Sequence, residues 1–403
     1  MRTFYILLVY YYVSIRSDRE LPERDLLMIP GPTNVDPSVL RSMSRQTLSH
    51  VSSDFANILK ETIRDLGKIF QTNSIILPIA GSGTLGAEVA LANVLEPGDK
   101  VLAISGGYFG DRLAEVAETL GAVVDKMEVP WGFIADSRQV QTKLSSTQYK
   151  ALLAVHVDTS TGALNPAREL AAAARSNGAL FVLDAVCSLG GIELLMDSWG
   201  IDVCFTGSQK ALAVPPGLAV VAFNQSAVKV RENRKSPIRT YYGDVKRWIP
   251  VLQDPTTYFA THATNMIYAL HRSCQMILAE GLEARFGRHA KLASAFRAAI
   301  QSMGLQLLCQ QNESANTMTV SRYPNGVEDA EFRKTMAENG VIVAGGLGPL
   351  KGKTFRVGHM GNINKNDLLA TISAIESTLA FQKFKFNEGA GVAAANRVLT
   401  SAT

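Results

Sequence analysis

The sequence has few cysteines, and they follow no recognisable spacing. Only four occur in 403 residues, without a C-x-x-C pair, and each lies in an apolar stretch: Cys187, Cys204, Cys274 and Cys309. This pattern argues against a disulfide framework and for buried thiols in a reducing compartment. The six histidines show no metal-ligand spacing either, so we predict no metal site.

Concentrated positive charge and long apolar runs are also missing. The net charge is only +4 and the basic residues are scattered, which argues against a nucleic-acid partner. The apolar run at the start of the chain is too short to span a bilayer and precedes no small-residue cleavage site. We therefore interpret residues 1–24 as an N-terminal extension and expect no membrane partner. The final Ser-Ala-Thr is not a peroxisomal signal, so we predict a cytoplasmic protein.

Strand and helix patterns alternate through the first two thirds of the chain. This rhythm predicts an α/β fold, a mostly parallel seven-stranded sheet with helices on both faces. The last two strands are joined by a short segment with Pro215-Pro216-Gly217, which is too short for a crossover helix, so one of them should be antiparallel. The predicted strands are residues 75–80, 100–105, 123–129, 152–157, 180–184, 203–206 and 218–223.

The last third of the chain predicts a smaller C-terminal α+β domain. Two long helices, 264–280 and a second reaching residue 303, precede it, and Asn364 is a good N-cap for its last helix. We predict a large domain over residues 25–282, a small domain over 283–381 and a loosely held tail over 382–403. The small domain should contain strands 305–309, 317–321, 341–344 and 354–357 and helices 329–339 and 364–380.

Gly81, Gly83 and Gly86 spell G-x-G-x-x-G after an apolar run, which is the outline of a dinucleotide-binding turn. A dinucleotide site also needs a carboxylate about 20 positions further on, where this sequence has Ser105-Gly106-Gly107. The interpretation of the chain as a nicotinamide-dependent dehydrogenase is therefore supported by the glycines alone. A single phosphate at the start of the following helix is the simpler ligand, and a tight turn without a ligand is the alternative.

Lys210 and Asp184 carry the strongest chemical signal. Lys210 lies in the short connection between two apolar strands, near the strand ends where ligands bind in such sheets, and a desolvated lysine can form a Schiff base. Asp184 ends an apolar strand, where a carboxylate can pair with the protonated ring nitrogen of pyridoxal phosphate. The alternative for Lys210 is an exposed loop lysine without a ligand, and the alternative for Asp184 is a helix N-cap. Together with the glycine turn, the two residues predict a pyridoxal-phosphate site.

Six motifs in a fixed order carry a resemblance to a known family. The chain resembles the class V pyridoxal-phosphate-dependent aminotransferases of fold type I, in the alanine–glyoxylate/serine–pyruvate aminotransferase family. The resemblance covers roughly residues 25–380, and the set is specific although each motif alone is weak. The motifs are PGPTNV (30–35), GSGT (81–84), HVDTSTGALNP (156–166), DAVCSLGG (184–191), GSQKALAVPPG (207–217) and FRVGHMG (355–361).

The resemblance implies a role for each matching residue around the cofactor pyridoxal 5'-phosphate. Lys210 matches the Schiff-base lysine that also moves the substrate proton, and Asp184 matches the partner of the ring nitrogen. The other matches are Val186 beneath the ring, Tyr108 stacked above it, Thr159 near the phenolic oxygen, and Ser82, Gly83, Thr84 and Gln209 around the phosphate.

The resemblance also implies a substrate site and a partner subunit. Arg356 matches the arginine that binds the substrate carboxylate, for which a planar guanidinium is suited. Gly31 and Asn34 lie on the loop expected to line the substrate pocket. Tyr258 and Thr261 match residues that reach the phosphate of a neighbouring subunit, which implies a homodimer with shared active sites.

The implied activity is a ping-pong transfer of an amino group from a small amino acid, alanine or serine, to a small 2-oxo acid, glyoxylate or pyruvate. A ureidoglycine–glyoxylate or pyridoxamine–pyruvate aminotransferase is the alternative within the family. A cysteine desulfurase fits less well, because such enzymes carry histidine before the lysine and a mobile cysteine, whereas Gln209 precedes Lys210 here.

Overall fold

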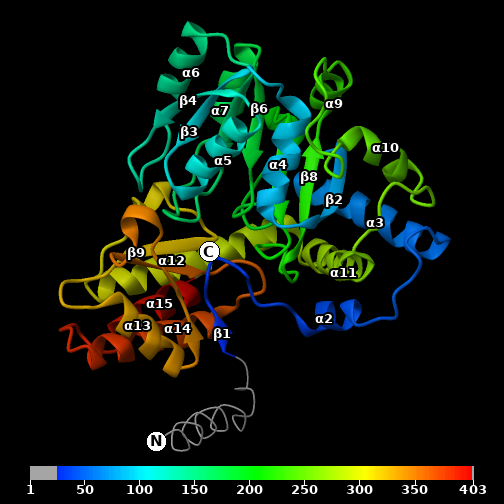
Figure 1. Cartoon of the computed structure of the whole chain (residues 1–403). Helices are drawn as coiled ribbons and strands as arrows, with labels where there is room; N and C mark the ends of the chain where they lie inside the picture. Colours follow the sequence, from blue (N-terminus) through cyan, green and yellow to red (C-terminus); the bar gives the residue numbers. More distant parts are fainter. Residues whose placement is uncertain (1–24, 402–403) are drawn as a thin grey trace, which may run out of the picture.

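The computed structural model describes residues 25–401, and the predicted extension of residues 1–24 lies outside the described residues. A large α/β part holds the seven-stranded sheet, and a smaller α+β part is built mainly from the C-terminal third of the chain. Figure 1 shows the sheet and its helices above, and α12 to α15 below them. The N-terminal strand β1 (Leu26–Leu27) pairs in parallel with β10 (Val341–Ile342) of the smaller part.

The seven strands of the large sheet lie in the order β2-β8-β7-β6-β5-β3-β4. Only β8 runs against its neighbours, since it is antiparallel to both β2 and β7. The mostly parallel sheet and its one reversed strand are confirmed, and the short link before β8 explains the reversal. The strands are β2 (Ile75–Gly81), β3 (Lys100–Ser105), β4 (Val123–Glu128), β5 (Ala151–Val155), β6 (Leu180–Asp184), β7 (Val203–Gly207) and β8 (Gly217–Phe223).

Helices cover both faces of this sheet, as predicted. In β3, Leu102 and Ile104 belong to the core beneath α3, α7 and α11, whereas Val101 and Ala103 belong to the core beneath α4 and α5. This alternation follows from the two-residue period of a strand. The helices of the large part are α2 (Pro37–Met43), α3 (Ser53–Phe70), α4 (Gly83–Val94), α5 (Tyr108–Thr119), α6 (Ser137–Ser146), α7 (Ala167–Ser176), α8 (Met196–Trp199), α9 (Gln225–Glu232), α10 (Val245–Gln253) and α11 (Thr264–Glu280).

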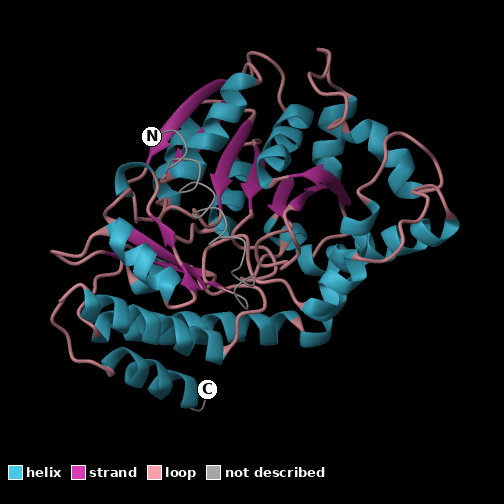
Figure 2. Ribbon diagram, turned by 60° about the horizontal axis from the view of Figure 1, so that its bottom comes forward, coloured by secondary structure: helices cyan, strands magenta, loops and turns pink. Residues whose placement is uncertain are grey.

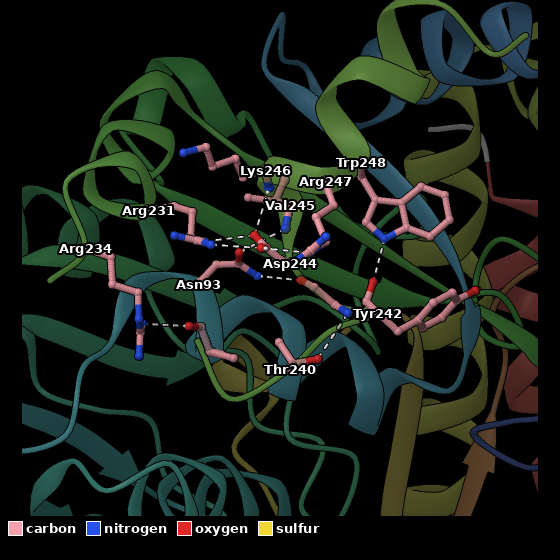
Figure 3. A network of polar contacts seen from close by, with 12 residues as sticks. Asn93, Arg231, Arg234, Thr240, Tyr242, Asp244, Val245, Lys246, Arg247 and Trp248 are labelled. Carbon is pink, nitrogen blue, oxygen red and sulfur yellow. Dashed lines mark hydrogen bonds and ion pairs between the residues drawn. The ribbon is translucent and has the colours of Figure 1, made fainter. Parts of the chain in front are cut away.

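A polar network holds the segment between β8 and α11 against the end of α4 (Figure 3). The buried Asn93 amide donates to the carbonyl of Gly243 at 2.7 Å and accepts from the Val245 N–H at 3.0 Å. Arg231 donates to both carboxylate oxygens of Asp244 at 2.8 Å. The connection that leads to Tyr258 is therefore anchored on the helix whose other end begins at Gly83.

The smaller part combines a three-stranded antiparallel sheet, β11-β12-β9, with four helices. Asn364 and Asp367 form the capping box of α14, which confirms the predicted N-cap. The predicted strand 305–309 is absent, because only Leu307 bridges to Ser321. The elements are α12 (Leu282–Ser302), β9 (Met318–Arg322), α13 (Asp329–Glu338), β11 (Ala344–Gly345), β12 (Thr354–Gly358), α14 (Lys365–Phe381) and α15 (Ala390–Thr400).

The prediction of a loosely held tail after residue 382 is wrong. Helix α15 packs along α12 and α14, and Figure 2 shows it beside the long helix at the C-terminal end. Ala394 and Ala395 are buried, and the N–H of Gly391 donates to Glu376 at 2.7 Å. Small residues allow this close approach, but they give a weak hydrophobic pattern, so the sequence signal was poor.

The packing of α15 predicts a contrast between two neighbouring alanines. Ala395→Asp should lower the free energy of unfolding by about 3 kcal/mol, because a carboxylate would be buried without a partner. Ala393 lies on the exposed face of the same helix, so Ala393→Asp is the matched control and should change stability by less than about 0.5 kcal/mol. Urea denaturation measures both. Equal stability of the two variants would contradict the packed position of α15.

Candidate active site

A cavity of about 270 Å³ lies where the carboxyl ends of β5 and β6 meet the start of α4. This is close to the lower end of the roughly 300–1,000 Å³ of small-molecule sites. Such crevices at the carboxyl ends of parallel strands are the usual ligand sites of open α/β sheets. Nine of the predicted site residues line it: Gly31, Ser82, Gly83, Thr84, Thr159, Asp184, Val186, Gln209 and Lys210.

The amine of Lys210 faces this cavity from the turn between β7 and β8. Its Nζ donates to the carbonyl of Pro30 at 2.6 Å, and burial lowers the pKa of Lys210. Gly31 has a φ of +139°, and a Cβ at that position would lie 2.6 Å from Cδ and 2.9 Å from Nζ of the lysine. Only glycine therefore lets the N-terminal loop close over Lys210. A lowered pKa makes the free amine easier to form, and the free amine is a nucleophile and a base.

The carboxylate of Asp184 is buried at the end of β6, and no ion pair reaches it from the described residues. Its Oδ1 accepts the N–H of Val186 at 2.8 Å. Burial raises the pKa of Asp184 to about 7; Asp158 adds to the rise, while Lys210 and Arg112 oppose it. A carboxylate buried in this way is stabilised by a cation, and the protonated nitrogen of a pyridine ring is such a cation.

One end of the cavity lies at the N-terminus of α4. Ser82 is the N-cap but makes no capping hydrogen bond, and the first turn has no acidic side chain. Gln209 Oε1 is buried without a hydrogen-bond partner in the described chain. A Cβ on Gly83 would lie 2.9 Å from a Val186 methyl group, so the turn has no room for a side chain. Free N–H groups at a positive helix end suit a phosphate.

The structure corrects which aromatic residue faces the cavity. Phe109 lines the cavity, whereas Tyr108 does not and is 38% exposed. Phe109 therefore holds the place on the cavity wall that the sequence prediction gives to Tyr108. Both residues lie in the first turn of α5, where neighbouring side chains point about 100° apart. Asp158 sets the start of this helix by accepting the N–H groups of Phe109 and Gly110, each at 3.0 Å.

Arg356 lies beside the cavity without lining it. Its Nε donates to the Gly345 carbonyl at 2.7 Å and its Nη1 to the Thr159 carbonyl at 3.1 Å. In the described chain its Nη2 makes no hydrogen bond, so this donor could bind a carboxylate. Asn34 does not line the cavity, because its amide donates to the Leu27 carbonyl at 2.9 Å and shapes the loop.

Tyr258 and Thr261 lie outside this cavity. Tyr258 is 68% exposed, and Thr261 is exposed as well. Neither residue contributes to the lining within its own subunit.

Several lining residues were missed from the sequence. Phe109 and Arg112 are one helical turn apart, as are Gly83 and Ala87, and this i, i+3 or i, i+4 spacing was the signal that could have found them. The remaining missed residues are apolar or proline and carry no distinctive pattern: Pro32, Leu113, Val155, Val157 and Pro216.

The fold and this site define the class of protein, a fold type I pyridoxal-phosphate enzyme. Residues 27–355 match the family model described as Aminotransferase class-V. The chain belongs to the class V aminotransferase family, and pyridoxal phosphate is the cofactor of that family. The described residues fit this cofactor, since they offer an amine, an unpaired buried carboxylate and a free helix N-terminus around one cavity.

The relatives agree on the family but differ in substrate. An uncharacterized aminotransferase of Methanocaldococcus jannaschii is 37% identical over 93% of this chain and 98% of its own. The serine–glyoxylate aminotransferase of Methylorubrum extorquens is 34% identical over 94% of this chain and 96% of its own. The crystal structure of ureidoglycine–glyoxylate aminotransferase from Bacillus subtilis has a TM-score of 0.90 at 35% identity and covers 95% of this chain and 100% of its own.

None of the helices within residues 25–401 is long and apolar enough to cross a membrane. In the same range no three histidine, cysteine or acidic side chains are grouped as metal ligands.

The buried carboxylate predicts how the stability of the cofactor-free protein depends on pH. The pKa of Asp184 is raised from 3.8 to about 7 on folding, so the stabilisation from this group is present below pH 3.8 and is lost as the pH rises through about 7. Asp184→Asn removes the charge and keeps an acceptor for Val186. Above pH 7 the variant should be more stable than the wild type by up to roughly 4 kcal/mol, and the two should converge near pH 4.

Urea denaturation of both cofactor-free proteins across this pH range measures the difference. A wild type that is more stable than Asp184→Asn at pH 8 would contradict the burial of an uncompensated charge.

Proposed function

We propose that this aminotransferase moves an amino group from a small amino acid, alanine or serine, to a small 2-oxo acid, glyoxylate or pyruvate. The observation that carries the proposal is the pairing of one buried amine, Lys210, with one buried carboxylate, Asp184, across a single small cavity. Relatives named for serine, alanine, aspartate and ureidoglycine as donors all have glyoxylate in their names, which supports a small acceptor.

Pyridoxal phosphate, when bound, supplies an electron sink for the substrate Cα–H bond. We assign the phosphate to the N–H groups at the start of α4 with Ser82, Thr84 and the Gln209 amide, and the ring to the space between Val186 and Phe109. Asp184 would hold the proton on the ring nitrogen. Burial lowers the pKa of Lys210. Its Nζ would accept the proton from the substrate Cα and would later return it during the same half-reaction.

Arg356 is proposed to bind the substrate carboxylate. Two of its donor atoms are fixed by the carbonyls of Gly345 and Thr159, so the guanidinium is held in place before substrate arrives. The amino acid and the 2-oxo acid share this carboxylate, and one pocket therefore serves both half-reactions. Ping-pong kinetics follow from that arrangement.

The buried thiols argue against cysteine desulfurase activity. All four cysteines are buried, burial raises the pKa of Cys309 to about 12, and the Cys309 thiol donates to the Thr161 carbonyl at 3.1 Å. A persulfide-forming cysteine needs an accessible thiolate. The unpaired thiols also support the proposed cytoplasmic location.

Lys210→Ala should abolish transamination, lowering kcat by about 10⁴-fold or more, because the nucleophile and the proton carrier are lost together. The visible absorbance of the purified holoenzyme should be lost in the same variant. Lys229 is exposed and distant from the cavity, so Lys229→Ala is the matched control and should behave as the wild type.

A panel of alanine, serine, aspartate and ureidoglycine with glyoxylate and pyruvate identifies the substrates. Full activity in Lys210→Ala would disprove the mechanism. A clear preference for ureidoglycine would replace the proposed donors and leave the mechanism intact.

A homodimer with shared active sites is also part of the proposal. The exposed Tyr258 and Thr261 lie on a segment with further aromatic residues, where Tyr241 is 67% exposed and its ring centroid is 5.3 Å from that of Phe259. Exposed aromatic clusters of this kind mark contact surfaces. Tyr258 would then contribute to the phosphate site of the neighbouring subunit.

Subunit mixing tests the shared site. Lys210→Ala and Tyr258→Ala should each be nearly inactive as pure proteins. After mixing and re-equilibration, about a quarter of wild-type activity should return, because half of the random dimers are mixed and each mixed dimer has one intact site. A mixture that stays inactive although mixed dimers form would contradict sharing, as would full activity of pure Tyr258→Ala.

A further inference from the structure

Arg112 lines the cavity but has no part in the reaction proposed above. It lies on α5, one turn after Phe109, and is half-buried. In the described part of the chain its guanidinium makes neither an ion pair nor a hydrogen bond. An arginine that lines a ligand cavity without a polar partner is unusual, because the guanidinium carries five hydrogen-bond donors and a positive charge.

Two acidic groups near Arg112 in sequence and space are already engaged by other partners. Asp111 accepts the hydroxyl of Ser105. Asp158 accepts the N–H groups at the start of α5 and the hydroxyl of Ser160. A carboxylate therefore does not fix the position of the Arg112 side chain.

Aromatic rings fix it instead. The guanidinium carbon of Arg112 lies 5.0 Å from the ring centroid of Phe109 and 5.0 Å from that of Tyr108. These two rings meet edge to face with centroids 5.5 Å apart. A guanidinium over aromatic rings is attracted by their π-electrons. The contact holds the rings of the first turn of α5 together, and Phe109 is the one that faces the cavity.

The charge of Arg112 also acts on Asp184. The titratable groups that face Asp184 are Asp158, Lys210, Arg112, Cys187 and Cys204. Asp158 favours the neutral carboxyl, whereas Lys210 and Arg112 favour the carboxylate. Burial raises the pKa of both thiols and lowers the pKa of Lys210. Arg112 contributes a positive charge to the same cavity as Asp184.

We propose that Arg112 is a positioning residue of this active site, which holds Phe109 toward the cavity and favours the ionised form of Asp184 for the ring nitrogen of the cofactor. The inference rests on the proposed roles of Asp184 and Phe109. It gives one side chain two effects, one through ring packing and one through charge, and these effects respond differently to substitution.

Two substitutions separate the effects. Arg112→Met keeps length and apolar contact with the rings but removes the charge, and Arg112→Lys keeps the charge but removes the planar stacking group. Lys100→Met is the matched control, since Lys100 also lies over an aromatic ring, that of Tyr149 at 5.4 Å, but begins β3 at the edge remote from the cavity. Arg112→Gln replaces Arg112→Met if the latter does not accumulate as folded protein.

The readout is cofactor release from the holoenzyme, followed by absorbance during dialysis between about pH 6 and 9, a range that includes the pKa of about 7 that Asp184 has in the cofactor-free site. Arg112→Met should release the cofactor about tenfold faster near neutral pH, with the pH profile displaced to higher pH. Arg112→Lys should keep the wild-type profile with release about two- to threefold faster. Lys100→Met should match the wild type.

An unchanged rate and profile in Arg112→Met would overturn the inference, and so would a profile displaced equally in Arg112→Lys. A merely structural role would alter the rate without moving the profile. Failure of the proposed function is recognised separately, because it would appear in the wild type as absent cofactor or in Lys210→Ala as retained activity.

Discussion

The active site depends on one unfavourable interaction, the burial of Asp184 without a cationic partner within the described chain. A carboxylate removed from water is destabilising unless it is hydrogen-bonded and paired. Here the Val186 N–H donates one hydrogen bond to the carboxylate. The part of the desolvation cost that this bond does not offset raises the pKa of Asp184 to about 7. The position at the end of β6, between β5 and β7, forces this burial. In the proposed role of Asp184, a cofactor whose ring carries a proton would relieve it, and cofactor binding and folding stability would then be linked at this residue.

The position of Lys210 depends on contacts between parts of the chain that lie far apart in sequence. The amine of Lys210 donates a hydrogen bond to the carbonyl of Pro30, 180 positions earlier. The hydroxyl of Thr33 donates to the backbone carbonyl of Lys210 at 2.8 Å. The same loop is held by the smaller part of the molecule, because the Gly358 N–H donates to Met28 at 2.9 Å. Close approach at Gly31 and Gly358 leaves no room for a side chain at either position. The N-terminal loop thus joins the two parts of the fold over the reactive amine.

Local sequence patterns predicted most of the helices and strands. They failed where tertiary packing determines the position of an element or the direction of a side chain. The apolar strands and the reversed β8 followed from hydrophobic runs and a short link, which are local properties. The tail helix α15 was missed because its buried face consists of Ala394 and Ala395 and its position depends on α12 and α14. The resemblance implies Tyr108, but Phe109 is its aromatic neighbour, and the sequence does not say where the helix begins. The capping of α5 by Asp158, about 50 residues later in the chain, decides which ring turns inward.

The sequence by itself determined the family and its cofactor, since Lys210, Asp184 and the glycine turn appear as local signatures with the spacing of one family. Only the tertiary structure decided which groups meet. It placed Phe109 and Arg112 on the cavity, fixed Arg356 through two backbone carbonyls and left Tyr258 outside. The physical reason is that the reactivity of a side chain follows from its residue type. Its burial and the electric field of its neighbours follow from contacts between segments that come together only on folding.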